Sequence, residues 1–233
     1  EIHKLFPEAS TIRMDIDTVS KKNSHEEILN TFKNDNIDIL IGTQMVVKGH
    51  HFPNVTLVGV VTADSSLNLE DYRAVERTFQ TLVQVAGRSG REKEGDVIIQ
   101  TYNPDHYAII EAQKQDYDSF YNQEIELRKM LNYPPFCDII MISFQGIDLN
   151  EIQKISNLVY KKIKSVNDEN INIFKPVPSP VDKIKNKYRW RIILKCKVTS
   201  RILDIINYGI EDERIKKCKN TRITVDINPN TMN

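Results

Sequence analysis

The stretch that decides the fold reads Ile37-Asp38-Ile39-Leu40-Ile41-Gly42-Thr43. This nearly continuous run of β-branched and apolar residues is typical of a strand buried on both faces of a parallel sheet. Residues 25–34, just before it, carry apolar side chains at helical spacing, and Ser24 is the expected N-cap. A helix leading into a buried strand predicts the repeating units of an α/β fold.

The same alternation continues on either side of this stretch. Further strands are predicted at residues 11–16, 55–61 and 97–101, and a further helix at 73–86. Residues 1–104 are therefore predicted to form an α/β domain with a parallel sheet covered on both faces. Ligands of such sheets bind at the carboxyl ends of the strands. Gly42 and Asp64 each follow a predicted strand and mark the expected place of the chemistry.

The chain changes character after residue 104. Residues 105–131 lack glycine and favour helix, and Tyr133-Pro134-Pro135-Phe136 ends them, so residues 105–136 are predicted to be a helical connector. Residues 137–233 are predicted to form a small α+β domain of the βαββαβ, ferredoxin-like kind. Its predicted elements are strand 138–145, helix 149–166, strand 171–174, a proline-spaced loop 175–180, strand 188–197, helix 201–208 and strand 223–227.

Charge is distributed unevenly along a chain whose formal net charge is +0. Residues 151–233 hold 18 basic and 9 acidic residues, which leaves 14 basic and 23 acidic in residues 1–150. The basic half is suited to a phosphate backbone or an acidic peptide, although a merely solvated lysine-rich surface would give the same count.

Apolar stretches and cysteines exclude several classes of protein. No stretch is long enough to span a membrane, and no signal peptide opens the chain. Cys137, Cys196 and Cys218 are scattered and form no CxxC pair. We therefore expect no disulfide framework, no metal site in this chain and a reducing cytosol.

Residues 42–49 are the first candidate for phosphate chemistry. The strand delivers Gly42 and Thr43 to its carboxyl end, Lys48 supplies a cation, and Gly49 closes the turn. Glycine permits close backbone approach to an anion, and the threonine adds a hydroxyl. Many strand-to-helix turns share this composition, so the motif alone is weak.

The second candidate reads Gln84-x-x-Gly87-Arg88-x-Gly90-Arg91. Arg88 and Arg91 are three residues apart and would project to one side of a helical turn. Their guanidinium groups are permanently charged and donate in a fork that fits phosphate oxygens. The alternative is a pair of surface arginines beside two turn glycines. The order of the two candidates along a parallel α/β pattern favours the phosphate interpretation.

At this point the sequence resembles a known family. Residues 42–49 resemble motif V, and residues 84–91 motif VI, of the superfamily 2 helicases. Residues 42–64, 71–91, 133–136 and 188–195 together are similar to the primosomal replication-restart helicases, the PriA family. The resemblance runs from about residue 2 to the end of the chain.

The resemblance implies a RecA-like second motor lobe of an ATP-dependent 3′-to-5′ DNA helicase. Such a helicase recognises and remodels stalled forks, assembles the primosome and works in the bacterial cytoplasm at the nucleoid. Forked and single-stranded DNA, the single-strand DNA-binding protein and other primosome proteins are its implied partners. The implied nucleotide contacts are Gln84, Gly87, Arg88 and Arg91, and the implied coupling residues are Gly42, Thr43, Lys48, Gly49 and Asp64.

Two helicase elements do not occur in the sequence. It contains neither a GxxxxGK[ST] phosphate loop nor a DExH box, which hold the phosphates and Mg²⁺ in such enzymes. We therefore expect ATP and Mg²⁺ to be held mainly by a first lobe, and the family's zinc to lie outside this chain. The chain is expected to be a C-terminal fragment that does not hydrolyse ATP alone.

Candidate DNA and partner contacts are concentrated in the basic half. Tyr188-Arg189-Trp190-Arg191 interleaves aromatic and cationic residues, which strand alternation places on opposite faces. DNA could contact both kinds of residue, or Trp190 could pack in the core while the arginines face solvent. Further candidates are Lys183, Lys185, Lys187 and His50 for DNA, and Arg201 for the acidic tail of the single-strand DNA-binding protein.

A non-catalytic nucleic-acid-binding module with a degenerate helicase-like lobe is the rival hypothesis. The paired arginines favour the motor, because a degenerate lobe has no reason to keep them.

Overall fold

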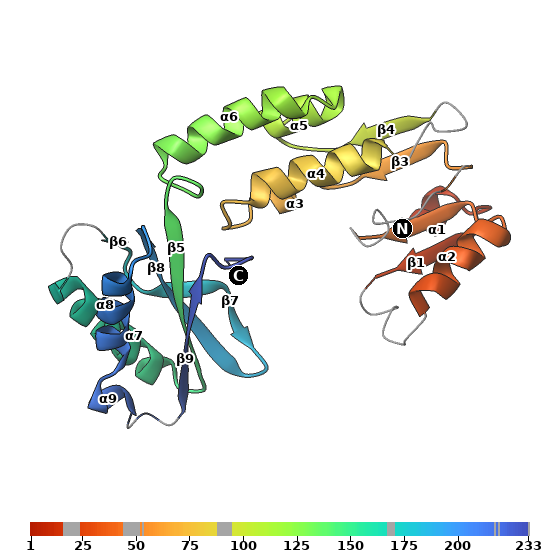
Figure 1. Ribbon diagram of the computed structural model, residues 1–233. Helices are drawn as coiled ribbons and strands as arrows, with labels where there is room; N and C mark the ends of the chain where they lie inside the picture. Colours follow the sequence, from red (N-terminus) through yellow and green to blue (C-terminus); the bar gives the residue numbers. More distant parts are fainter. Residues whose placement is uncertain are drawn as a thin grey trace. The chain divides into compact units, whose positions relative to one another are not determined.

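The structure, a computed structural model, describes residues 1–15, 24–43, 52, 54–87, 95–166, 171–216, 218 and 220–232. It divides into two compact units (Figure 1). The first comprises Glu1–Asn68 and Val75–Phe120, and the second comprises Leu69–Ala74 and Tyr121–Asn233. A segment of six residues from the first half of the chain thus belongs to the second unit, an arrangement that the predicted domain boundaries did not contain.

The strands of the first unit pair in parallel, as the sequence predicted, but the described residues do not form the single sheet that was expected. β1 (Thr11–Met14) pairs in parallel with β2 (Ile39–Gly42), and β3 (Leu57–Val60) pairs in parallel with β4 (Asp96–Ile99). Among the described residues these are two separate two-stranded sheets. The accompanying helices are α1 (Ile2–Leu5), α2 (Ser24–Asn34), α3 (Asp64–Leu67) and α4 (Ala74–Ala86).

Helix α4 is held by an apolar cluster of the first unit. Its Phe79 and Leu82 are buried together with Ala108 and Ala112 of α5 (Tyr107–Lys114). Phe120 of α6 (Tyr117–Met130) stacks on Phe79, with ring centroids 4.0 Å apart. The helices predicted for residues 105–131 are therefore present, and they fix one face of α4.

The second unit is built on an antiparallel sheet in the order β6-β8-β5-β9. The central strand β5 (Asp138–Gly146) pairs on one side with β8 (Lys187–Cys196) and on the other with β9 (Thr221–Ile227). The short strand β6 (Asn172–Ile173) pairs with the far end of β8. This order, with α7 (Leu149–Val166) after the first strand and α8 (Ser200–Ile210) before the last, confirms the predicted ferredoxin-like arrangement.

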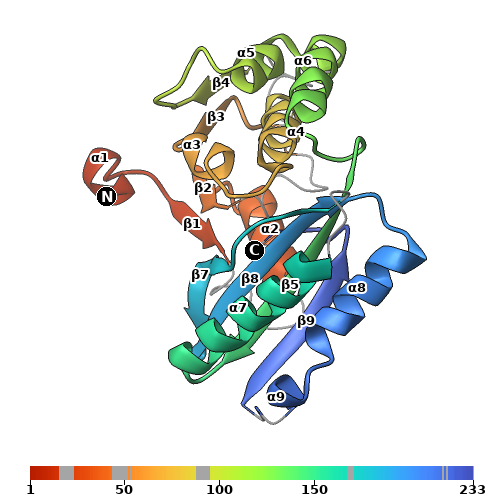
Figure 2. The ribbon, with the colours of Figure 1, turned by 90° about the vertical axis from the view of Figure 1, so that its left-hand side faces the viewer.

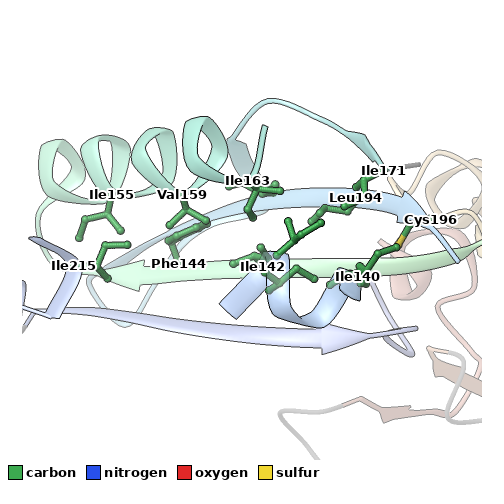
Figure 3. Close-up of a cluster of buried hydrophobic side chains, with 14 of the residues drawn as sticks. Ile140, Ile142, Phe144, Ile155, Val159, Ile163, Ile171, Leu194, Cys196 and Ile215 are labelled. Carbon is green, nitrogen blue, oxygen red and sulfur yellow. The ribbon is translucent and has the colours of Figure 1, made fainter. Parts of the chain in front are cut away.

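Helices α7 and α8 lie on the same face of this sheet (Figure 2). Ile155, Val159 and Ile163 of α7 point toward the strands, where they meet Ile142 and Phe144 of β5 (Figure 3). All of these residues are buried, so this face of the sheet is the core of the second unit. A short helix, α9 (Glu213–Lys216), follows α8.

The prediction of a proline-spaced loop at residues 175–180 is wrong. Residues Val177–Ile184 form a strand, β7, which pairs with the first half of β8. Its Pro178 is tolerated because β7 lies at the edge of the sheet, where a missing N–H breaks no inner ladder. The pairing shifts register between Pro178 and Lys183, which shows how the strand accommodates its prolines.

The lysines expected in that loop belong instead to a β-hairpin. Lys183 lies near the end of β7, and Lys187 begins β8. Lys185 and Asn186 form the turn, with φ angles of 48° and 62°. Positive φ at both central residues is the geometry that a two-residue hairpin prefers. No described helix is long and apolar enough to cross a membrane.

Candidate nucleotide site and nucleic-acid interface

The end of α4 carries the first described residue of the arginine motif. Gln84 is exposed in the last turn, while Leu82 and Val85 beside it are buried. The helix ends at Ala86, and the N–H of Gly87 still donates to the carbonyl of Val83 at 3.0 Å. A packed helix thus presents the Gln84 amide to solvent directly before the arginines. Arg88 and Arg91 themselves lie outside the described residues.

The end of β2 carries the start of the other motif. Gly42, its last residue, and Thr43 are both exposed. The structure thus places both residues at the carboxyl end of a parallel strand, where an exposed backbone and hydroxyl are suited to an anionic ligand. Lys48, Gly49 and His50 lie outside the described residues.

Asp64 ties together the ends of two strands. Its carboxylate accepts a hydrogen bond from the Thr101 hydroxyl at 2.9 Å and from the N–H of Tyr102 at 3.1 Å. Desolvation raises the pKa of this carboxyl, but the hydrogen bonds outweigh it and leave the pKa below its ordinary value. A charged carboxylate is therefore held where β3 and β4 both end. Sequence analysis missed Thr101 and Tyr102, because nothing local connects them to Asp64.

Asp64 is not the N-cap of α3, because it is the first residue of the helix. The N-cap is Ala63, and this cap has no side-chain hydrogen bond. The exposed amide, hydroxyl and backbone groups at Gln84, Thr43 and Gly42 are donors of the kind that phosphate oxygens accept. Each of these groups is exposed, at the end of α4 or at the carboxyl end of β2.

The sheet face opposite α7 and α8, which we call the open face, carries a row of polar residues. Gln145 of β5 lies in register with Arg189 of β8 on one side and Arg222 of β9 on the other. This row borders a hollow of about 210 Å³, whose other polar lining residues are Ser143, Ser179, Thr224 and Asp226. Two guanidinium groups flanking an amide are suited to a nucleic-acid backbone. Arg222 was missed, although it alternates with the apolar Ile223 in the sequence.

Strand alternation along β8 is as predicted, with aromatic residues on one face and cations on the other. Tyr188 and Trp190 pack against the core on the helix-covered face, which is the alternative considered above for Trp190. Trp190 is therefore placed to fill the core rather than to stack on bases. Lys183 on the neighbouring strand lies over the Tyr188 ring, 4.5 Å from its centroid.

Arg191 has a different environment from Arg189. Its side chain is only 5% exposed and donates to Glu70 at 2.7 Å and to the carbonyl of Met232. The sequence grouped it with the DNA contacts because alternation places it on the open face. That face is covered at this point by residues from both ends of the second unit, so Arg191 is not accessible to a phosphate.

The remaining candidate is Arg201, which is exposed in the first turn of α8. The N-cap of this helix is Thr199, whose side chain accepts from the N–H of Ile202.

Among the described residues, no group of three or more His, Cys, Asp or Glu side chains lies together where it could hold a metal ion.

In a comparison with known proteins, a different family model matches each half of the chain. Residues 4–93 match the helicase conserved C-terminal domain, and residues 129–230 match the primosomal protein N C-terminal domain. The whole chain is 39% identical to the replication restart protein PriA of Bacillus subtilis, of which it spans 29%. The chain belongs to the PriA family. It corresponds to the C-terminal part of these proteins.

Other PriA proteins give the same picture. The chain is 38% identical over 95% of its length to PriA of Synechocystis, of which it spans 26%, and 34% identical over 97% to PriA of Haemophilus influenzae, of which it spans 31%. The match to the PriA C-terminal domain begins within α6 and includes the open face. The match to the helicase domain includes residues 42–49, residues 84–91 and α4.

Proposed function

We propose that the protein carrying this chain is an ATP-dependent 3′-to-5′ DNA helicase that recognises and remodels stalled replication forks and restarts replication through primosome assembly. The observation that carries the proposal is the joint match to a helicase domain and a PriA C-terminal domain. The exposed Gln84 at the end of α4, directly before the arginine motif, supports it from the structure.

The chain's contribution to ATP hydrolysis is half of a site. ATP with Mg²⁺ supplies the phosphoryl group whose transfer releases the energy for movement. Gln84, Arg88 and Arg91 donate to the nucleotide from the second lobe, and the arginines stabilise the charge that develops on the transferring group. Thr43, with the Lys48-Gly49 turn, links this site to the DNA strand. Zinc belongs to another part of the full-length protein.

The motor interpretation is tested by separating the chain from the rest of the protein. We expect no measurable ATPase activity from the purified chain, and DNA-stimulated ATPase activity when the remaining part of the protein is supplied. Unwinding should require a 3′ single-stranded tail and fail with a 5′ tail. Robust turnover by the chain alone would contradict the half-site assignment. Failure of the combined parts to hydrolyse ATP would support the rival, a non-catalytic nucleic-acid-binding module.

The second unit is proposed to bind single-stranded DNA on its open face. Arg189 and Arg222 flank Gln145 there, and Lys183, Lys185 and Lys187 surround the adjacent hairpin turn. Cations around a polar row favour contacts to phosphates without reading the bases. The exposed Arg201 is proposed to bind the acidic tail of the single-strand DNA-binding protein, because the two carry opposite charges.

Removal of either open-face arginine should weaken DNA binding. Arg189→Ala and Arg222→Ala are each expected to lower the affinity of this chain for a labelled single-stranded oligonucleotide by several-fold. Each should also reduce the slope of log K against log salt by about 0.7, the value for one phosphate contact on a single strand. Fluorescence anisotropy over a range of KCl concentrations measures both quantities.

Lys154→Ala is the matched control, because Lys154 is an exposed cation on α7, which covers the other face of the sheet. Its affinity and salt slope should equal those of the unaltered chain. An equal loss in all three variants would show that net charge, and not the open face, determines binding.

A further inference from the structure

Residues 69–74, which we call the anchor segment, connect α3 to α4 but belong structurally to the second unit. Residues 75–120, which belong to the first unit, separate them in the sequence from the rest of the second unit. Three of their side chains, from Glu70, Asp71 and Arg73, each make a separate polar contact with it. A segment that only connected α3 to α4 would not need three separate contacts with the second unit.

The first contact is the ion pair between Glu70 and Arg191, with 2.7 Å between Oε2 and Nη2. The Arg191 side chain is 5% exposed, whereas the Glu70 side chain is 70% exposed. A buried guanidinium is costly unless a carboxylate and hydrogen bonds compensate its charge. Glu70 supplies the carboxylate, and the carbonyl of Met232 supplies a second acceptor. The anchor segment thus compensates the positive charge of Arg191, in the central part of β8.

The second and third contacts hold the last residues of the described chain. Asp71 accepts from the N–H of Met232 at 3.2 Å, and Arg73 donates to the carbonyls of Pro229 and Asn230 at 3.2 and 3.1 Å. Asp71 also organises the start of α4, because its side chain accepts from the N–H of Arg73 and its carbonyl from that of Ala74. One aspartate therefore joins the end of the second unit to the first turn of α4.

An aromatic contact completes the attachment. Tyr72 stacks on Tyr133 with ring centroids 5.5 Å apart and an angle of 11° between the rings. The guanidinium of Arg128 lies over the same Tyr72 ring at 5.4 Å. Both tyrosines pack against the buried cluster of Cys137, Ile139 and Met232. The anchor segment is thereby fixed by apolar packing as well as by charge.

The position of the anchor segment in the chain gives these contacts a consequence. Asp64 and α3 lie immediately before it, and α4 begins at its last residue, Ala74. α4 is a single helix of 13 residues that ends at Ala86, directly before Gly87-Arg88-Ser89-Gly90-Arg91. A helix transmits a displacement of its first turn to its last. Both elements assigned to the nucleotide site are therefore attached, through the anchor segment, to the second unit.

The open face lies close to this attachment along the same strand. Arg189 and Arg191 are two positions apart on β8 and on the same face of the sheet, which separates them by roughly 7 Å. Ser143 of β5, in register with Arg191, borders the same hollow as Arg189. A DNA strand bound at Arg189 would thus lie next to the ion pair that holds the anchor segment.

We propose that the anchor segment is the positioning element that links DNA bound on the second unit to ATP hydrolysis, with Glu70 and Arg191 as its positioning residues. This inference rests on the proposed function. Neither residue contacts the nucleotide. The ion pair fixes the first turn of α4, and α4 in turn sets where the arginine motif lies when DNA is bound.

The test uses the full-length protein and the variant Glu70→Gln, which keeps the size of the side chain and removes its charge. We expect kcat of DNA-stimulated ATP hydrolysis to fall about tenfold, the scale of a typical coupling between two sites. The KM for ATP, the affinity for DNA and the ATPase rate without DNA should stay within about twofold of the unaltered protein. Glu70→Asp should recover most of the stimulated rate, and Arg191→Lys should give an intermediate rate.

Glu126→Gln, which neutralises an exposed carboxylate on α6 of the same unit, is the matched control and should behave like the unaltered protein. Unchanged stimulation in Glu70→Gln would overturn the inference. So would an equal loss of DNA affinity and of basal rate, since that would be the effect of a destabilised unit. Absence of DNA-stimulated hydrolysis in the unaltered protein would instead overturn the proposed function.

Discussion

Replacement of Arg91 by alanine is expected to lower the DNA-stimulated ATPase rate of the full-length protein by about a thousand-fold or more, the scale of an arginine finger. Under the proposed function, the guanidinium stabilises the negative charge of the phosphate oxygens in the transition state of phosphoryl transfer. Arg91→Lys should recover little of the rate, because an ammonium keeps the charge but lacks the planar fork. Steady-state ATP hydrolysis at saturating DNA measures the effect.

Arg13→Ala is a suitable control for this prediction. Arg13 is an arginine of the same unit, its side chain is 67% exposed, and its partner is Asp15. Loss of a surface ion pair of this kind should change the ATPase rate by less than about twofold. DNA affinity should remain in Arg91→Ala, because the open face belongs to the other unit. Unchanged turnover in Arg91→Ala would leave the second lobe without a catalytic role.

The parts of the fold that the sequence predicted are those set by local periodicity. The β-branched run at residues 37–41 and the helical spacing at 25–34 are sufficient to predict β2 and α2. Alternation along residues 188–196 likewise separates the side chains of β8 into two faces. Periods of 2 and 3.6 residues are properties of the chain itself, so they can be recognised without knowing what packs against each element.

The features that the sequence did not predict depend on distant partners. Prolines at 176, 178 and 180 favoured a loop, but the edge of β8 provides a place where a proline-containing strand can pair. Alternation correctly placed Arg191 on the face opposite Trp190, yet its acceptor Glu70 lies 121 residues away in the sequence. Alternation determines the face that a side chain occupies. It carries no information on whether another segment covers that face, and here the anchor segment does.

Truncation of Ile142 is expected to have the largest effect on stability of the substitutions considered. Ile142 is fully buried between β8 and β9 at the centre of β5, against α7 and α8. Ile142→Ala should lower the free energy of unfolding of the second unit by about 2–5 kcal/mol. The substitution removes buried aliphatic groups, and the packed neighbours cannot fill the cavity that remains. Trp190 is the chain's only tryptophan and packs against this core. Its fluorescence in a urea titration therefore reports this unit alone.

Ile147→Ala makes the same chemical change five residues further along, where Ile147 is 59% exposed just after the end of β5. It should shift the free energy of unfolding by less than about 0.5 kcal/mol, since little apolar surface is buried there. The two variants differ in burial and not in the atoms removed, so the difference between their urea midpoints at a common slope isolates the contribution of the core. Equal midpoints for the two variants would mean that Ile142 does not lie in the packed layer between the sheet and its two helices.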